Sequence, residues 1–305
     1  MRFKKLNLNL IVVLDALLAE NSVTKAGQRL HVSQTTISDA LARLREYFND
    51  ELLTQVGRKM VPTPLGATLV QPVRDMLLQA DIILNTQPTF DPAAAERKFT
   101  FMISDYVSTV LMMKVIPLVS QLAPKVTIEM MQQSRMPSES LDRGDIDFLI
   151  IPETFLAASS PSQHLFTDDF CCVAWTGNPL IGERIDEKQF LQLGHVVVKL
   201  GETRQPSIEE WFFKTLRGNR RVETVTMDFN SAPQAVVGTN RLAVMHTKLA
   251  RHYAAFLPIR LVPVTFALPV LNEHIQWNRY SAHDPAIIWM RDLLVSMARV
   301  ELQTP

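Results

Sequence analysis

The apolar residues near the start of the chain recur at the spacing of an α-helix. Within LNLIVVLDALLAE they occupy one helical face, formed by Leu10, Val13, Leu14, Leu17 and Leu18. A second helix is expected over 23–30, and the corner HVSQ leads into a third. Ser33 stands where an N-cap belongs, ahead of the inward-facing positions Ile37, Leu41 and Leu44. The pattern predicts two short helices around a tight corner.

The outward face of the third predicted helix carries short hydroxyl and amide side chains at its N-terminal end. Such side chains can approach base edges and phosphates closely, and an arginine further along the helix would meet the DNA backbone. The alternative is a plain helical hairpin whose polar face is only solvated. The candidate DNA-contacting residues on this helix are Ser33, Gln34, Thr35, Thr36, Ser38, Asp39 and Arg43.

The next segment, LLTQVGRKMVPTP at 52–64, has the pattern of two short strands around a Gly-Arg-Lys turn. Pro62 and Pro64 end the second strand. A basic hairpin directly after a helix of this composition is typical of a wing. Arg58 and Lys59 would lie at its tip, within reach of phosphates or the minor groove.

Another helical pattern, PLGATLVQPVRDMLLQADIILN, begins at Pro64. Its apolar positions alternate in steps of four and three, which predicts a coiled-coil seam of about two heptads. Two such helices would pair two copies of the chain, since one winged unit contacts too few base pairs. The alternative is a helix packed on its own domain, and Pro72 adds an expected kink. The candidate pairing residues are Leu69, Val73, Met76, Ala80 and Ile83.

Beyond a Pro- and Ala-rich hinge, TFDPAAAERK, short apolar strands such as FTFMIS, VTIEMM, DFLIIP and HVVVKL alternate with helices. This alternation predicts an α/β fold with a mostly parallel sheet covered on both faces. Ligands of open sheets of this kind bind outside the carboxyl ends of the strands. That rule selects Ser104, Asp105, Tyr106 and Pro152 as candidate ligand contacts.

The composition indicates a folded protein, but the overall charge does not indicate a binding partner. Apolar residues make up 47% of the 305 residues, which indicates a folded chain, and 31 basic residues balance 31 acidic ones. Residues 1–62 carry nine basic and six acidic side chains, a modest basic bias that suits DNA binding. No cleavage site follows the first apolar run, and no stretch has the length of a membrane span. We therefore expect a cytoplasmic protein with no membrane partner.

No catalytic or metal-binding pattern appears along the sequence. A Gly-rich phosphate loop, HExxH, paired CxxC and GxSxG are all absent, and the seven histidines are scattered. We therefore expect no enzyme, no metal site and no cofactor. The adjacent Cys171 and Cys172 lie in an apolar run, which favours two small buried side chains over a disulfide. The alternative class is an enzyme or solute-binding protein with an incidental helical hairpin.

The N-terminal residues resemble those of LysR-type transcriptional regulators. The family's Ala-Ala, Leu, Ser-Gln, Ser and Leu positions match Ala26-Gly27, Leu30, Ser33-Gln34, Ser38 and Leu44. Gly27 replaces the usual second alanine at some cost in helix stability, and QTTIS leaves open which bases are contacted.

The resemblance spans the whole chain and implies three parts. They are a winged helix-turn-helix domain at 1–63, a dimerising linker helix at 64–89 and an effector-binding domain at 90–305. The effector-binding domain would have two lobes, as periplasmic binding proteins do. Lobe I would comprise about 90–165 plus 268–305, and lobe II about 166–267.

Within the family, the segments GDIDFLIIPE, GHVVVK and DPAIIWMR resemble the NodD, NahR, PcpR and LinR subgroup, whose members respond to aromatic or phenolic compounds. By this resemblance His195 and Trp277 match positions that contact an aromatic ligand, while Asp228 replaces a ligand-contacting histidine. His195 also begins an apolar strand, so a structural histidine is an equal alternative. Tyr106 and Trp277 suit either a stacked aromatic ring or plain packing.

The resemblance further implies an activator that binds promoter DNA as a dimer, usually within a tetramer, and that contacts RNA polymerase. Ligand binding would change the arrangement of lobes and subunits. QTTISDALARLR and MQQSRMPSES depart from the nodulation pattern, which favours an effector from chlorinated phenol or hydroquinone catabolism. The alternative is a flavonoid-responsive nodulation regulator.

Overall fold

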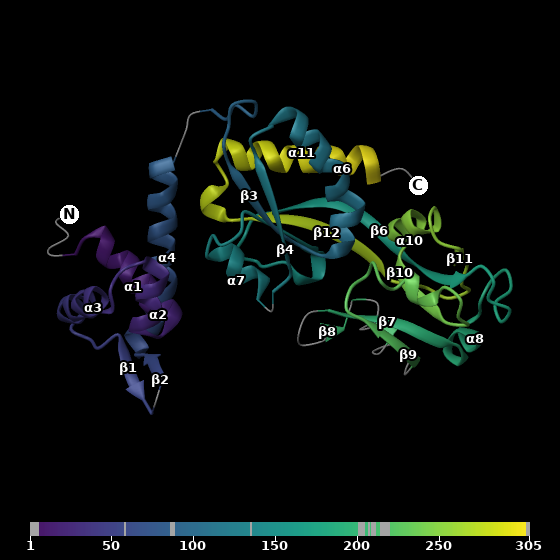
Figure 1. The fold of residues 1–305 in the computed structure, drawn as a ribbon, viewed down its shortest axis with the longest axis horizontal. Coiled ribbons are helices and arrows are strands. Elements are labelled where there is room, and N and C mark those ends of the chain that lie inside the picture. Colours follow the sequence, from purple (N-terminus) through teal and green to yellow (C-terminus); the bar gives the residue numbers. More distant parts are fainter. Residues whose placement is uncertain are drawn as a thin grey trace. The chain divides into compact units, whose positions relative to one another are not determined.

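The computed structural model describes residues 6–57, 59–85, 89–134, 136–200, 205–206, 208, 212–213 and 220–302. The chain divides into two compact units, Met1–Thr86 and Gln87–Pro305 (Figure 1). The division falls inside the segment that the sequence predicts as a linker.

The smaller unit contains four helices and a two-stranded hairpin among its described residues. In chain order these elements are α1 (Leu8–Glu20), α2 (Val23–Leu30), α3 (Gln34–Phe48), β1 (Leu53–Val56), β2 (Lys59–Pro62) and α4 (Pro64–Asn85). The strands β1 and β2 pair antiparallel, with Val56 opposite Lys59. The predicted helix-turn-helix and wing are therefore both present.

Polar side chains cap the three N-terminal helices. The side chains of Asn7, Ser22 and Ser33 accept backbone N–H bonds in the first turns of α1, α2 and α3 respectively. His31 ends α2 with a φ of 55°, a left-handed conformation that turns the chain sharply toward α3. The predicted inward residues, such as Leu14, Ile37 and Leu44, are fully buried in one core.

The larger unit is built on one sheet with helices on both faces. Its strands are β3 (Lys98–Ile103), β4 (Thr127–Gln132), β5 (Phe148–Pro152), β6 (Ser162–Trp175), β7 (Gly194–Leu200), β8 (Gln205–Pro206), β9 (Arg221–Thr226), β10 (Leu242–His246), β11 (Ile259–Val262) and β12 (Val270–Trp277). Its helices are α5 (Asp105–Val107), α6 (Met113–Leu122), α7 (Pro137–Asp142), α8 (Glu187–Gln192), α10 (Thr247–Ala254) and α11 (Pro285–Leu302).

The strand order is β4-β3-β5-β12-β6-β10-β7-β8, with β11 beside β6 and β9 beside β7. Pairing is parallel among β4, β3 and β5 and among β10, β7 and β9. It is antiparallel wherever β6 or β12 takes part. The prediction of a mostly parallel sheet is wrong for this middle part, because β6 and β12 run in opposite directions between the two parallel sets.

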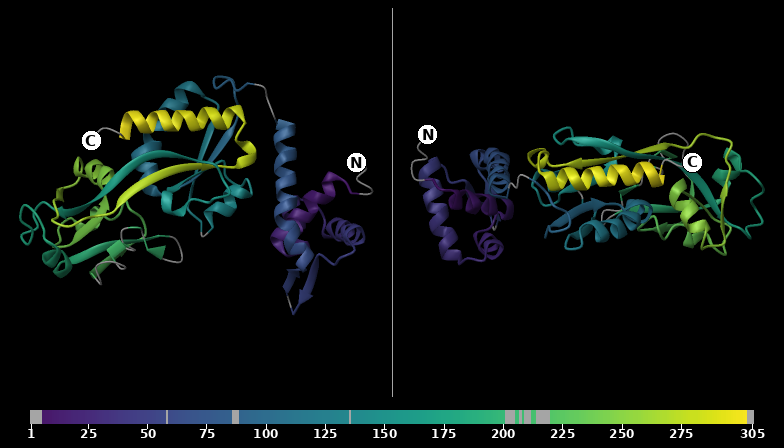
Figure 2. Two further views of the ribbon diagram at one scale, coloured as in Figure 1. Left: turned by 180° about the vertical axis from the view of Figure 1, so that it is seen from behind. Right: turned by 90° about the horizontal axis from the view of Figure 1, so that it is seen from above.

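Helices cover both faces of the first parallel set. On one face α6 and α11 bury Phe101, Phe148 and Met290 in the main core, and α11 lies along β6 (Figure 2). On the other face α7 contributes Leu141 to a smaller cluster with Leu149. Successive residues of a strand thus serve opposite cores, which explains why these strands are apolar throughout.

The chain after β3 does not form one regular α-helix, because a π-helical turn, Ser108–Met112, separates α5 from α6. The segment SIEEWFFKTLR, whose pattern is helical, lies largely outside the described residues. Cys171 and Cys172 are both free thiols, and burial raises the pKa of Cys171 to about 12.

Candidate functional site

The polar face of α3 is exposed over its first two turns. Gln34, Thr35, Ser38, Asp39 and Arg43 all lie open to solvent, whereas the intervening Ile37, Ala40 and Leu41 are buried. Ser33 and Thr36 are also exposed, but their hydroxyl oxygens lie 2.8 Å apart and bond each other. The candidate DNA-contacting residues of α3 therefore share one accessible face.

A threonine from α2 fixes the carboxamide of Gln34. The Thr24 hydroxyl donates to Gln34 Oε1 over 3.3 Å. This bond occupies the acceptor end of the carboxamide and leaves its NH₂ group as a donor. A free donor at the start of α3 can bond an acceptor such as purine N7 or a phosphate oxygen.

Arg45, two residues after Arg43 on the same helix, bonds the chain that follows α3. Its guanidinium donates to the carbonyl oxygens of Glu51 and Leu53, each over 2.9 Å, and pairs with the Glu51 carboxylate. These bonds tie α3 to the first strand of the wing. Sequence spacing could not show them, because they depend on how the chain turns after α3.

The wing presents Lys59 at the start of β2, where its side chain is exposed. Gly57 has a φ of 63°, a left-handed conformation that closes the hairpin turn without a side-chain clash. Arg58, the other predicted tip residue, lies outside the described residues.

The predicted pairing residues of α4 divide into two groups. Leu69 and Val73 pack into the core of their own unit, and Val73 is only 4% exposed. Ala80 is half-buried, whereas Met76 and Ile83 are 39% and 76% exposed. The first part of the seam therefore packs as the alternative interpretation expected, and only the later part is open.

An ion pair fastens α4 to the first helix. The buried Arg74 guanidinium lies 2.8 Å from the Asp15 carboxylate, which also lies 3.4 Å from Arg29 of α2. One carboxylate thus joins three helices, and the spacing of apolar residues alone gave no sign of it.

Four of the predicted ligand contacts cluster at the end of β3 and after β9. Ser104 caps α5, and the Asp105 carboxylate accepts the Asn230 backbone N–H over 2.9 Å. Asp228 accepts from both the backbone N–H and the hydroxyl of Ser231. Burial, and secondarily the negative charge of Asp228, raise the pKa of Asp105.

The fourth member of this group, Tyr106, is buried and points inward. It is 1% exposed, and its hydroxyl donates to Asp168 Oδ2 over 2.7 Å. Its ring stacks on His246 with centroids 3.8 Å apart. Tyr106 therefore already has a stacking partner within the protein.

The other three predicted contacts lie elsewhere. His195 is fully buried on β7, with Nε2 2.8 Å from the Phe190 carbonyl oxygen, and burial lowers its pKa to about 4. Trp277 is 7% exposed at the end of β12, with the Arg291 guanidinium 5.0 Å from its ring. Pro152 is half-buried opposite Glu273. This packing favours the structural alternative for His195.

The buried acid Glu273, which the sequence analysis did not select, lies near Asp168. Glu273 is 3% exposed, and its Oε2 has no hydrogen-bond partner among the described residues. Burial first, and the charge of Asp168 second, raise its pKa to about 8. The signal was a glutamate at an inward position of VLNEHIQW, between the core residues Leu271 and Ile275.

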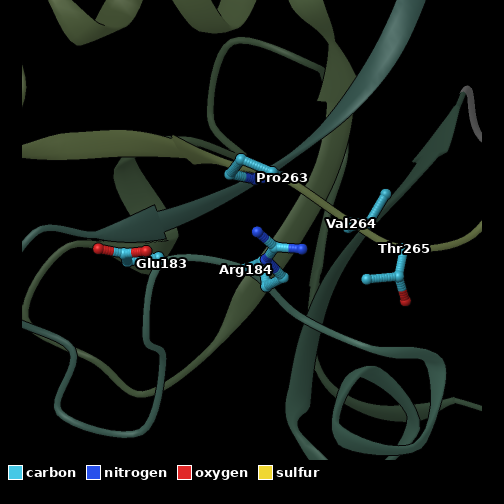
Figure 3. Close-up of a pocket in the computed structure, with 5 residues that line it drawn as sticks. All are labelled: Glu183, Arg184, Pro263, Val264 and Thr265. Atoms are coloured by element: carbon cyan, nitrogen blue, oxygen red, sulfur yellow. The ribbon is translucent and has the colours of Figure 1, made fainter.

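None of the predicted contacts lines the small pocket of about 270 Å³ that Figure 3 shows. It is lined by Glu183, Arg184, Pro263, Val264 and Thr265. Within the described ranges, no group of three or more His, Cys, Asp or Glu side chains could hold a metal ion. Over the same residues, no helix has both the length and the apolar character needed to cross a membrane.

Two family models match the chain, one for each unit. Residues 8–67 match the bacterial regulatory helix-turn-helix protein model of the lysR family, and residues 93–299 match the LysR substrate binding domain.

Individual proteins match along nearly the whole chain. Nodulation protein D 2 of Rhizobium tropici is 41% identical over 298 residues, which are 98% of this chain and 95% of that protein. The structure of a probable transcriptional regulator from Pseudomonas aeruginosa is 25% identical, with a TM-score of 0.64, and covers 95% of this chain and 97% of that one. A full-length OxyR variant from Pseudomonas aeruginosa matches in fold, with 19% identity, a TM-score of 0.70 and coverage of 97% and 96%.

Proposed function

The chain belongs to the LysR family of bacterial transcriptional regulators, and from that premise we propose that it activates transcription in response to a small phenolic compound. It is a regulator and not an enzyme, because its family and its relatives are regulators. It binds DNA and a small-molecule effector, as both matched domains imply.

The observation that carries the DNA contacts of this proposal is the exposed start of α3. Gln34, Thr35 and Ser38 would enter the major groove, while Arg43 and the wing residue Lys59 would contact phosphates. The bond from Thr24 would hold the Gln34 carboxamide with its NH₂ toward the bases. Ser33 and Thr36, whose hydroxyls bond each other, would support the helix start.

The exposed apolar end of α4 supports a dimer. Ile83 and Leu84 are largely exposed, Met76 is partly exposed, and Ala80 is small enough for close helix contact. Two paired units would contact a two-fold symmetric DNA site. A tetramer and contact with RNA polymerase complete the proposal by analogy with the family.

The effector identity rests on relatives more than on geometry. The curated relatives at 37–41% identity include several nodulation proteins D, which support the nodulation-type alternative over chlorophenol catabolism. A ligand near Ser104, Asp105 and Asp228 would meet hydrogen-bond acceptors, which suits phenolic hydroxyl groups. His195, Tyr106 and Trp277 are too buried to contact it without rearrangement.

The test is a mobility-shift titration on the DNA upstream of the gene, repeated with flavonoids and with chlorinated phenols. Gln34→Ala should weaken specific binding by about tenfold or more, since a base contact is worth about 1–3 kcal/mol. The matched control Gln79→Ala removes an exposed glutamine of α4 and should bind as the unmodified protein does.

Each outcome has a definite meaning. Binding that changes with one compound class supports the regulator and identifies its effector. Binding that ignores every compound keeps the DNA function and removes the phenolic effector. Absence of specific DNA binding would overturn the proposed DNA contacts.

A further inference from the structure

The predicted lobes of the larger unit, lobe I (90–165 plus 268–305) and lobe II (166–267), are joined through two strands. β6 pairs with β12 along its first part and with β10 and β11 along its second part. Helices α5 and α6 belong to lobe I, whereas α10 and the turn after β9 belong to lobe II. Any bond between α5 and these lobe II segments therefore restrains the two lobes relative to each other.

One such restraint centres on Asp105. Its carboxylate, at the start of α5, accepts the backbone N–H of Asn230 over 2.9 Å. The Asn230 side chain lies 3.1 Å from the Thr109 hydroxyl, which belongs to the turn that follows α5. These contacts join residues more than 100 positions apart in the chain.

The turn that reaches Asp105 is itself rigid. Asp228 accepts the backbone N–H and the hydroxyl of Ser231, each over 2.7 Å, and its carbonyl oxygen accepts from Thr226. A carboxylate that bonds the N–H groups of its own turn holds them in one direction. The turn therefore presents the Asn230 N–H group to Asp105 as a preformed donor.

A second carboxylate, that of Asp168, also restrains the two lobes. Asp168 of β6 is 4% exposed, and its Oδ2 accepts the Tyr106 hydroxyl over 2.7 Å and the Lys248 backbone N–H over 3.2 Å. Tyr106 belongs to α5 and Lys248 to the first turn of α10. The stack of Tyr106 on His246 reinforces the same junction.

We propose that Asp105 and Asp168 are positioning residues of an interlobe latch, and that effector binding regulates the protein by changing how the lobes are held by this latch. The inference rests on the proposed function, because it assigns a regulatory role to the junction beside the predicted effector contacts. It also gives Asp105 and Tyr106 a task beyond ligand contact, which is to hold the two lobes together.

The geometry explains why this junction suits a switch. Both carboxylates bond backbone or hydroxyl donors of the opposite lobe, so a small displacement breaks several bonds together. A ligand shifts a two-state equilibrium only through different contacts in the two states. A hydroxyl-bearing ligand that bonds Asp105 would replace the Asn230 N–H donor and would favour the unlatched arrangement.

The test uses the full chain and amide hydrogen exchange. Asp105→Ala should speed exchange across 228–231 by about tenfold or more, because the Asn230 N–H loses its acceptor. Thr109→Val, which removes only a hydroxyl, should have a smaller effect in the same segment, and Thr109→Ser should restore protection. The control Asp292→Ala removes an exposed carboxylate that pairs with the adjacent Arg291, and exchange across 228–231 should not change.

A second readout separates regulation from stability. DNA bending by the unliganded Asp105→Ala and Tyr106→Phe proteins should differ from bending by the unmodified protein, while both variants retain its melting temperature within a few degrees. Unchanged exchange at 228–231, or faster exchange with unchanged bending, would overturn the latch. Failure of the unmodified protein to bind DNA would instead count against the proposed DNA contacts, and the exchange data would still test the bonds of the junction.

Discussion

At the scale of single residues, Glu273 makes stability depend on pH between about 4.5 and 8. The folded chain holds this carboxyl with a pKa of about 8, because burial and the nearby Asp168 both oppose its negative charge. An unfolded chain would release the proton near the ordinary pKa of 4.5. The folded state therefore binds the extra proton, and its stability must fall as pH rises from about 4.5 to about 8.

Two buried histidines determine the pH range in which the effect of Glu273 on stability can be tested. Burial lowers the pKa of His195 to about 4 and that of His246 to about 3. The two histidines act in the opposite direction. Below pH 6.5 the unfolded chain binds protons that the folded chain does not bind, so the free energy of unfolding increases as pH rises toward 6.5. Above that pH they no longer contribute, and the effect of Glu273 stands alone among these three groups.

We predict that the free energy of unfolding falls by about 1 kcal/mol per pH unit between about pH 6.5 and 8. Glu273→Gln should flatten this slope, since it keeps the shape of the side chain and removes the ionisation. Denaturant unfolding at several pH values measures the effect, and Asp292→Asn serves as an exposed control. A slope that persists in Glu273→Gln would show that another group is responsible.

At the scale of elements, the start of α4 is fixed to the end of α3 by a group of short polar contacts. The Thr63 hydroxyl donates to Asp50 over 2.6 Å and accepts the Gly66 N–H over 2.9 Å. The Leu52 carbonyl oxygen accepts the Thr63 N–H over 3.0 Å. These contacts bring the backbone of Gly66 against that of Leu52. The residues before and after the wing therefore lie side by side.

Gly66→Ala should therefore destabilise the smaller unit although alanine favours helices. A Cβ at this position would overlap the Leu52 carbonyl oxygen, which is backbone and cannot move alone. We expect a loss of about 2 kcal/mol or more, which outweighs a gain of about 1 kcal/mol in helix propensity. Thermal unfolding followed by circular dichroism tests this, with Gly182→Ala as a control in open space. Equal stability of the two variants would contradict the expected clash.

The sequence pattern predicted the elements that depend on residues close to one another in the chain. The Ser33 cap and the spacing of Ile37, Leu41 and Leu44 gave α3, because caps and helical faces depend on neighbours within a few positions. The bond between Asp105 and Asn230 gave no such signal, since the two residues meet only after the lobes form. For the same reason the sequence pattern could not decide where Val73 packs, because an apolar side chain suits a dimer seam and the core of its own unit equally.

At the scale of the whole molecule, the two parts of α4 have different tasks. The first part is committed to its own unit through Val73 and through the buried pair of Arg74 with Asp15. The later part carries Ile83 and Leu84, which are 76% and 77% exposed. Apolar side chains this exposed at the end of a long helix favour contact with another chain. The smaller unit therefore folds with α4 in place, and its short exposed apolar segment fits the proposed pairing of two chains.

We predict that Ile83→Glu weakens self-association by about tenfold or more, because a like pair of carboxylates would replace apolar contact at a two-fold interface. The matched control Gln79→Glu adds the same charge off the predicted seam and should associate as the unmodified chain does. Sedimentation velocity over a range of protein concentrations measures the effect. Because paired units would contact paired half-sites, Ile83→Glu should also lose affinity for a two-half-site DNA while its affinity for a single half-site is unchanged. Equal weakening by both variants would indicate that charge, and not the apolar segment, controls association.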